Sequence, residues 1–160
     1  MGKSSANDSF MRVVEALNDI AEDVIVWPRE DRCIAVSEKF QRIGRLPYVI
    51  GAIDGTNIPI KAPKVNARFY ISKDKEYAIT LQAVCDAELR FLYCFAGFAG
   101  SVGDRRVLRN SDLWKEINAN RASYFVDQDY IIGDKAYPCI SWLIPPFVNL
   151  GQLTEADGDD

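Results

Sequence analysis

The 160-residue sequence contains no histidine. This absence excludes Ser-His-Asp and Cys-His catalysis, and it excludes every zinc site that uses an imidazole ligand. Any reaction that the chain catalyses must therefore depend on carboxylates, lysines, tyrosines or thiols.

Closely spaced cysteine pairs and long apolar runs are also missing. The four cysteines, Cys33, Cys85, Cys94 and Cys139, show no C-x-x-C spacing, so we expect buried free thiols in a reducing compartment. A disulfide between Cys85 and Cys94 is the alternative. No N-terminal segment joins a charged start to an apolar run, and no apolar run approaches the ~20 residues of a membrane span. We therefore expect a soluble protein that is neither secreted nor bound to a membrane.

Hydrophobic residues make up 48% of the chain and aromatic residues 11%, which suffices for one domain with a real core and excludes disorder for most of the chain. The formal net charge of −4 comes from the last six residues, because residues 1–154 hold nineteen acids and nineteen bases. The body is therefore neutral and the tail acidic. A sequence pI near 4.9 does not exclude nucleic-acid binding, which depends on a local basic face.

The spacing of apolar residues predicts two helices followed by a buried strand. Apolar side chains recur every three to four residues over 9–24, and a second such face runs over 29–43, directly after Pro28. From Tyr48 the pattern changes to a nearly continuous apolar run, YVIGAID, which is typical of a strand buried on both faces. We expect this strand, 48–54, to lie in the centre of a sheet.

The rest of the chain alternates between strand and helix patterns. The runs YAITLQAVCD and FLYCFAGFAG predict an antiparallel hairpin with a turn around 87–89. A helix is expected from Ser111 or Asp112 to about Asn118, and a further short strand at 130–134. This order indicates an α/β domain with a mixed sheet, in which the strands at 48–54 and 130–134 can lie side by side.

Three acids follow strands in this arrangement. Asp54 and Asp134 each close an apolar strand, and Asp104 lies in a glycine-rich loop after the third strand. Carboxylates gathered at one end of a sheet repel one another unless cations neutralise them, so the pattern predicts bound Mg²⁺ or Mn²⁺. Two such ions activate water and stabilise the leaving oxygen in phosphodiester cleavage.

Each acid also has a purely structural interpretation. Asp54 precedes a glycine, as in an ordinary turn, Asp134 can cap the segment that follows it, and Asp104 can be a solvated loop residue. Similarly, Arg105 and Arg106 can hold phosphates or can form a solvated, paired helix face.

The sequence of residues 59–76 predicts a loop that carries a cluster of basic residues. Lysines and arginines alternate there with the aromatic residues Phe69 and Tyr70, which can stack on bases or anchor the loop in the core. From this loop and the following helix we select five candidate phosphate contacts: Lys61, Lys64, Arg68, Arg105 and Arg106.

The segments GAIDGTNIPI, FAGFAGSVGDRRVLRNSDLW and IIGDKAYPCISWLIPPF, in this order, resemble the Harbinger transposase-derived nucleases of the DDE superfamily. The resemblance spans residues 46–153. It implies a ribonuclease H-like fold, endonuclease activity on DNA that depends on a divalent metal, and a nuclear setting. We expect the nucleus as the main compartment, with the cytoplasm as an additional one. It also implies a separate DNA-binding partner protein that supplies targeting.

By position, the resemblance assigns metal binding to Asp54 in G-A-I-D-G-T, Asp104 in G-S-x-x-D and Asp134 in G-D-x-x-Y-P, with Asp54 and Asp134 as the catalytic pair. We accordingly expect a helical N-terminal segment at residues 1–45, a nuclease domain at 46–153 and a disordered acidic tail at 154–160.

The chain departs from the family pattern at three points. Asn57 stands where the first motif usually has histidine, and Gly103 stands where the second often has one. The family's final catalytic glutamate lies on a later helix, which this chain does not reach, and neither Glu155 nor Asp157 sits in a matching motif. The alternatives to an active nuclease are therefore an inactive remnant that binds metal or DNA, or an incomplete product without a function of its own.

Overall fold

The structure, a computed structural model, describes residues 3–147. Its helices are α1 (Lys3–Val24), α2 (Asp31–Gly44), α3 (Asp104–Asn110) and α4 (Asp112–Ala119), with 3₁₀ turns at Ala67–Tyr70 and Arg121–Ser123. Its strands are β1 (Val49–Pro59), β2 (Ala78–Cys85), β3 (Phe91–Ala99), β4 (Tyr130–Gly133) and β5 (Leu143–Ile144). Within this range no helix is both long and apolar enough to cross a membrane. The acidic tail expected at 154–160 lies outside the described residues.

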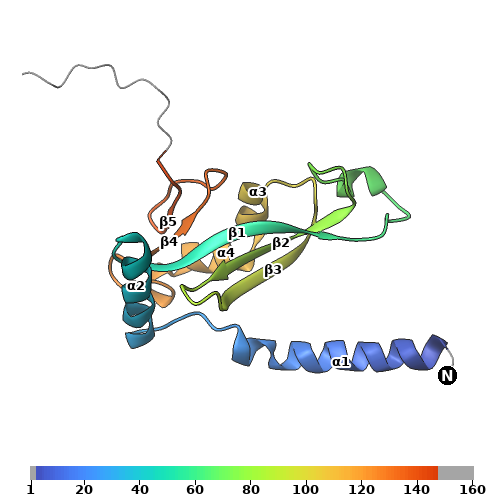
Figure 1. Cartoon of the computed structure of the whole chain (residues 1–160), viewed down its shortest axis with the longest axis horizontal. Coiled ribbons are helices and arrows are strands. Elements are labelled where there is room, and N and C mark those ends of the chain that lie inside the picture. The colour runs from blue at the N-terminus through green and yellow to red at the C-terminus, as the bar shows by residue number, and fades with distance from the viewer. Residues whose placement is uncertain (1–2, 148–160) are drawn as a thin grey trace, which may run out of the picture.

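The strands form one mixed sheet in the order β3-β2-β1-β4-β5 (Figure 1). β2 pairs antiparallel with β1 and with β3, whereas β4 pairs parallel with β1 and with β5. Helices flank this sheet and a long helix precedes it. The predicted α/β, ribonuclease H-like fold is confirmed, and β1 occupies the expected central position.

Several elements extend further than their patterns predict. The first helix begins at Lys3, well before residue 9, and β1 continues past Asp54 because β2 pairs with it as far as Pro59.

Asp104 does not lie in a loop but opens α3, a helix that the sequence pattern did not indicate. Ser111 separates α3 from α4, since its hydroxyl donates to the Leu108 carbonyl (2.7 Å) and accepts the Trp114 N–H (3.2 Å).

Most of the core lies on one face of the sheet, but the start of β1 is buried on both faces, since Val49, Ile50 and Gly51 are consecutive buried residues. Along β2, side chains on one face are buried and those on the other are only half-buried, which is the alternation expected for a strand covered on one side. Helices α2, α3 and α4 each contribute residues to this core, and α1 contributes none. The core residues are Cys33, Val36, Ile50, Ile53, Val84, Leu92, Leu108, Leu113, Ile117, Phe125, Ile131, Tyr137, Trp142 and Leu143.

The four cysteines are free thiols, so the alternative of a Cys85–Cys94 disulfide is wrong. The expectation of burial holds fully only for Cys33, because Cys85 and Cys94 are half-buried and Cys139 is exposed. Burial raises the pKa of the Cys33 thiol to about 11, which keeps it protonated and unreactive at neutral pH.

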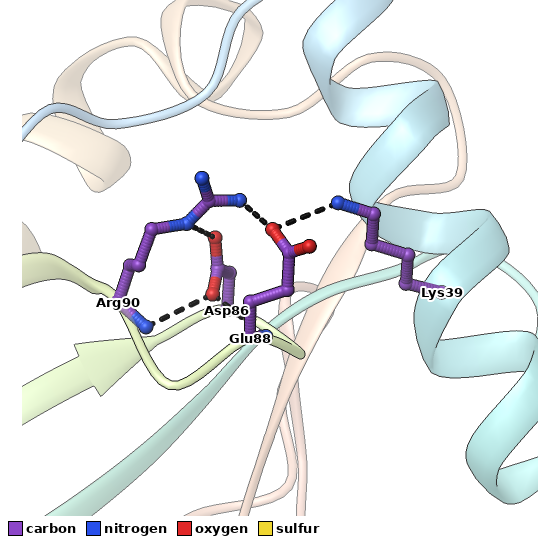
Figure 2. Close-up of polar contacts among 4 residues, drawn as sticks. All are labelled: Lys39, Asp86, Glu88 and Arg90. Atoms are coloured by element: carbon purple, nitrogen blue, oxygen red, sulfur yellow. Dashed lines mark hydrogen bonds and ion pairs between the residues drawn. The ribbon is translucent and has the colours of Figure 1, made fainter.

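The turn between β2 and β3 is organised by the carboxylate of Asp86, whose side chain is almost fully buried (Figure 2). Asp86 Oδ1 accepts the backbone N–H groups of Glu88 (2.9 Å) and Arg90 (3.0 Å), and Oδ2 accepts Arg90 Nε (3.0 Å). Glu88 pairs in turn with the Arg90 guanidinium and with Lys39 Nζ (2.8 Å). This cluster closes the hairpin and attaches it to α2.

We expect Asp86→Ala to lower the free energy of unfolding by about 2 kcal/mol, because it removes one acceptor shared by three donors. Lys39→Ala is the matched control and should cost about 0.5 kcal/mol or less, since a surface ion pair contributes little. Urea unfolding followed by circular dichroism measures both changes. Equal losses in the two variants would show that the carboxylate does not organise the turn.

Candidate active site

Asp54 and Asp134 lie at neighbouring positions in the sheet. In the parallel pairing of β1 with β4, Ile53 is the register partner of Gly133, and each aspartate is the next residue along its strand direction. Both side chains are exposed. Asp54 Oδ1 accepts the Gly55 N–H and Asp134 Oδ1 accepts the Ala136 N–H, each at 2.8 Å. The predicted adjacency of the two strands is confirmed, and it brings these two acids to one place.

Asp104 approaches β1 from the helix-covered face of the sheet. Its carboxylate lies so close to Gly55 that a β-carbon on this glycine would collide with Oδ1. Gly55 shares a face with its register partner, the buried Gln82. Because successive strand residues point to opposite faces, the side chain of Asp54 points to the other, less covered face. The backbone of β1 therefore separates Asp54 from Asp104.

The three carboxylates nevertheless affect one another electrostatically. Burial raises the pKa of Asp104, and the negative charges of Asp134 and Asp54 raise it further. The charge of Asp54 also contributes, after burial and Asp86, to the raised pKa of Cys85 on the less covered face. A cation bound near these acids would relieve this repulsion.

The acids match a divalent cation in donor chemistry, since Mg²⁺ and Mn²⁺ prefer carboxylate oxygens. Across residues 3–147, however, no three His, Cys, Asp or Glu side chains lie close enough together to hold a metal ion. Asp54 and Asp134 are neighbours, whereas Asp104 lies across the strand from Asp54. A metal site with all three ligands stays a prediction.

A buried polar network, which the sequence analysis missed, connects Asp104 to the turn after β4. Gln82 is fully buried, and its Nε2 donates to the Asp104 carbonyl and to Tyr137 Oη, both at 3.1 Å. The Tyr137 backbone N–H donates to the Asp134 carbonyl (3.2 Å), and its ring lies against Gly133. The only signals in the sequence are a glutamine inside an apolar strand and the tyrosine of G-D-x-x-Y-P. Gln82 and Tyr137 thus hold the start of α3 and the turn at Asp134 together.

A small cavity of about 160 Å³ lies beside the Asp104 carboxylate. Asn57 and Gly103, the two positions where the resembling family commonly has histidine, both line it. The hydroxyl of Thr80 also lies there, buried and without a hydrogen-bond partner among the described residues. The two departures from the family pattern therefore fall at one place next to Asp104.

The five basic candidates lie in two groups, and all are exposed. Arg105 and Arg106 belong to α3 and line a cavity of about 430 Å³ that also reaches Asp104. Lys61, Lys64 and Arg68 lie in the segment after β1, where the guanidinium carbon of Arg68 is 4.9 Å from the Phe69 ring centre.

A hydrogen bond connects the segments that carry the two basic groups, since Ser101 Oγ donates to the Phe69 carbonyl (2.5 Å). In the part of the chain that the structure describes, none of the five candidates forms a salt bridge. Arg105 and Arg106 are therefore not part of a paired helix face, which was the alternative interpretation. Their role as phosphate contacts stays a prediction.

Comparisons with known proteins match most of the chain. The profile of a family described as DDE superfamily endonuclease matches residues 53–159, a range that includes all three acids. Protein ALP1-like of Arabidopsis thaliana is 31% identical over 158 residues, which cover 92% of this chain and 38% of that protein. The Xenopus laevis protein named "Putative nuclease HARBI1" is 26% identical over 160 residues, which cover 99% and 44%. The chain thus spans about two fifths of these relatives, and no solved structure matches it.

Replacing Gly55 by alanine is expected to lower the free energy of unfolding by about 1–3 kcal/mol, because the new methyl group must displace the Asp104 carboxylate. Gly103→Ala is the control, since a β-carbon there meets no atom within 4 Å. Chemical unfolding of both variants tests this close approach, and identical midpoints would contradict it.

Asp104→Asn is expected to raise the melting temperature at neutral pH in the presence of EDTA. A carboxyl with a raised folded-state pKa favours folding while it is protonated, and this contribution is lost as the pH rises through that pKa. The gain from the neutral amide should therefore be largest near pH 7 and vanish towards about pH 3. Thermal unfolding across this range measures it, with Asp74→Asn on an exposed loop as control. A gain that did not depend on pH would contradict the electrostatic origin.

Proposed function

The chain belongs to the DDE superfamily endonuclease family, and from this membership we propose that it forms part of a nuclease of transposase origin that hydrolyses phosphodiester bonds in DNA. The observation that carries the proposal is the parallel pairing of β1 with β4, which places Asp54 beside Asp134. A relative that covers nearly the whole chain is itself named a nuclease.

In the proposed reaction, Asp54 and Asp134 would hold a divalent cation, Mg²⁺ or Mn²⁺. Both carboxylates are exposed at the surface and are fixed in direction by backbone N–H groups that leave other oxygen lone pairs free. Asp104 adds negative charge from the other side of Gly55. A divalent cation held by these carboxylates would supply Lewis acidity towards the phosphate and would make a water molecule more acidic.

The basic residues bind the DNA backbone in this proposal. Arg105 and Arg106 share a cavity with Asp104, so phosphates held by these guanidinium groups would lie next to this carboxylate. Lys61, Lys64 and Arg68 extend the basic surface along the segment after β1. Such contacts position the duplex without reading its sequence, so a separate DNA-binding partner protein would supply target choice in the nucleus.

A second candidate function is a protein that binds DNA without cutting it. The observation that favours it is the absence, within residues 3–147, of three metal-ligating side chains in mutual reach. A protein of this kind keeps the fold and the basic surface. Its affinity for duplex DNA should fall steeply with salt because counterions are released on binding.

We expect the purified chain to nick supercoiled plasmid DNA with Mn²⁺ or Mg²⁺ and to lose this activity in EDTA. Asp54→Asn should slow nicking by about 100-fold or more, because it removes a charged ligand. Asp74→Asn is the control and should cut like the wild type. Agarose gels of nicked and supercoiled plasmid over time measure the rates.

Identical cleavage by the wild type and Asp54→Asn would refute the nuclease proposal for this site. An absence of cleavage together with salt-sensitive binding to a labelled duplex, measured by fluorescence anisotropy, would establish the second candidate function. An absence of both cleavage and binding would refute the two candidates together.

A further inference from the structure

Helix α1 carries an apolar stripe that the described part of the chain leaves exposed. Phe10, Val13, Leu17, Ile20 and Val24 keep 51–70% of their surface accessible. The helix has 22 residues, so its length is about 33 Å at the usual rise per residue. Leaving an apolar stripe of this length exposed to water is unfavourable in free energy, and such exposed apolar surfaces commonly mark interaction sites.

The rest of the described chain does not cover this stripe. The core contains no residue of α1, and of the side chains described in the helix only Val14 and Ala21 are half-buried. Figure 1 shows α1 as a separate rod that the segment 25–30 joins to α2. The apolar stripe is therefore available to another molecule.

The spacing of the stripe matches a second helix better than the surface of a globular body. The steps along it are three, four, three and four residues, which are the a and d positions of a heptad repeat. The positions that flank this seam are mostly small or uncharged, including Ser9, Ala16 and Ala21. Small flanking residues let two helices approach closely.

The charges of α1 favour a second copy of the same helix in the opposite direction. Asp23 is the one charged residue in the positions that flank the seam between residues 7 and 23, so like charges do not block pairing of identical helices. Arg12 balances Asp8 in residues 5–13, whereas residues 14–24 hold four acids and no base. An antiparallel pair keeps the two acidic halves apart and also opposes the helix dipoles.

We propose that α1 is a self-association element through which two copies of this chain form an antiparallel helix pair. The seam consists of Phe10, Val13, Leu17, Ile20 and Val24 from each copy. The resulting dimer is two-fold symmetric, because the same surface of each chain meets itself. This role is independent of the proposed nuclease activity and uses none of its residues.

The first test is the mass of the whole chain in solution, measured by sedimentation equilibrium from about 1 to 100 µM. The wild type should reach twice its monomer mass of 18.0 kDa within this range. Leu17→Asp should weaken the dimer at least ~100-fold, since it places two charges in the seam. Val65→Asp is the matched control, as Val65 is also an apolar and exposed residue (72% against 58% for Leu17) but lies outside α1. Circular dichroism verifies that both variants keep their helix content.

A wild type that is monomeric at 100 µM, or a Leu17→Asp variant that stays dimeric, would overturn the proposal. The direction of pairing is tested by electron paramagnetic resonance with a nitroxide label on Ser5→Cys, in a background where the three accessible cysteines are replaced (Cys85→Ser, Cys94→Ser and Cys139→Ser). Antiparallel helices place the two labels more than about 25 Å apart, given the rise per residue. Parallel helices place them within about 20 Å, given the usual interaxial distance. The shorter separation would overturn the antiparallel arrangement.

Discussion

The parallel pairing of β1 with β4 is the contact on which the candidate site depends. Its register sets Ile53 beside Gly133, and the absence of a side chain at Gly133 makes room for the ring of Tyr137. Tyr137 in turn reaches Gln82, which also holds the Asp104 carbonyl. A shift of one residue in this register would turn every side chain of β4 to the other face of the sheet. It would separate Asp54 from Asp134 and break the network behind them.

The same strand pair also explains why the three acids are not equivalent. β1 passes between Asp54 on its less covered face and Asp104 on its helix-covered face. Asp104 is partly buried, and its carboxylate carries the electrostatic cost that its raised pKa reflects. Asp54 and Asp134, by contrast, are exposed to solvent. The three acids therefore fall into two kinds. Asp54 and Asp134 form a solvated pair at the surface, whereas Asp104, on the other side of β1, is a partly buried carboxyl that is harder to ionise.

The sequence predicted the order and pairing of the strands better than it predicted on which face of the sheet each side chain lies. Apolar runs that end in acids identified β1 and β4, and their adjacency followed from the order of elements. The position of Asp104 in α3 was missed because this helix has only seven residues, too few to show helical periodicity. The role of Gln82 was missed because a single polar residue in an apolar strand does not reveal what lies above it. Alternation along β1 separates neighbours such as Asp54 and Gly55, so convergence of carboxylates cannot be inferred from strand ends alone.

The close approach of Asp104 to Gly55 also bears on how these two segments change over generations. The space beside the Gly55 backbone is filled by the carboxylate of Asp104, a residue almost fifty positions later in the chain. A side chain at position 55 costs less stability where position 104 carries a smaller residue, because no carboxylate then has to be displaced. We therefore expect the residues at positions 55 and 104 to covary, because a substitution at one position changes which side chains fit at the other.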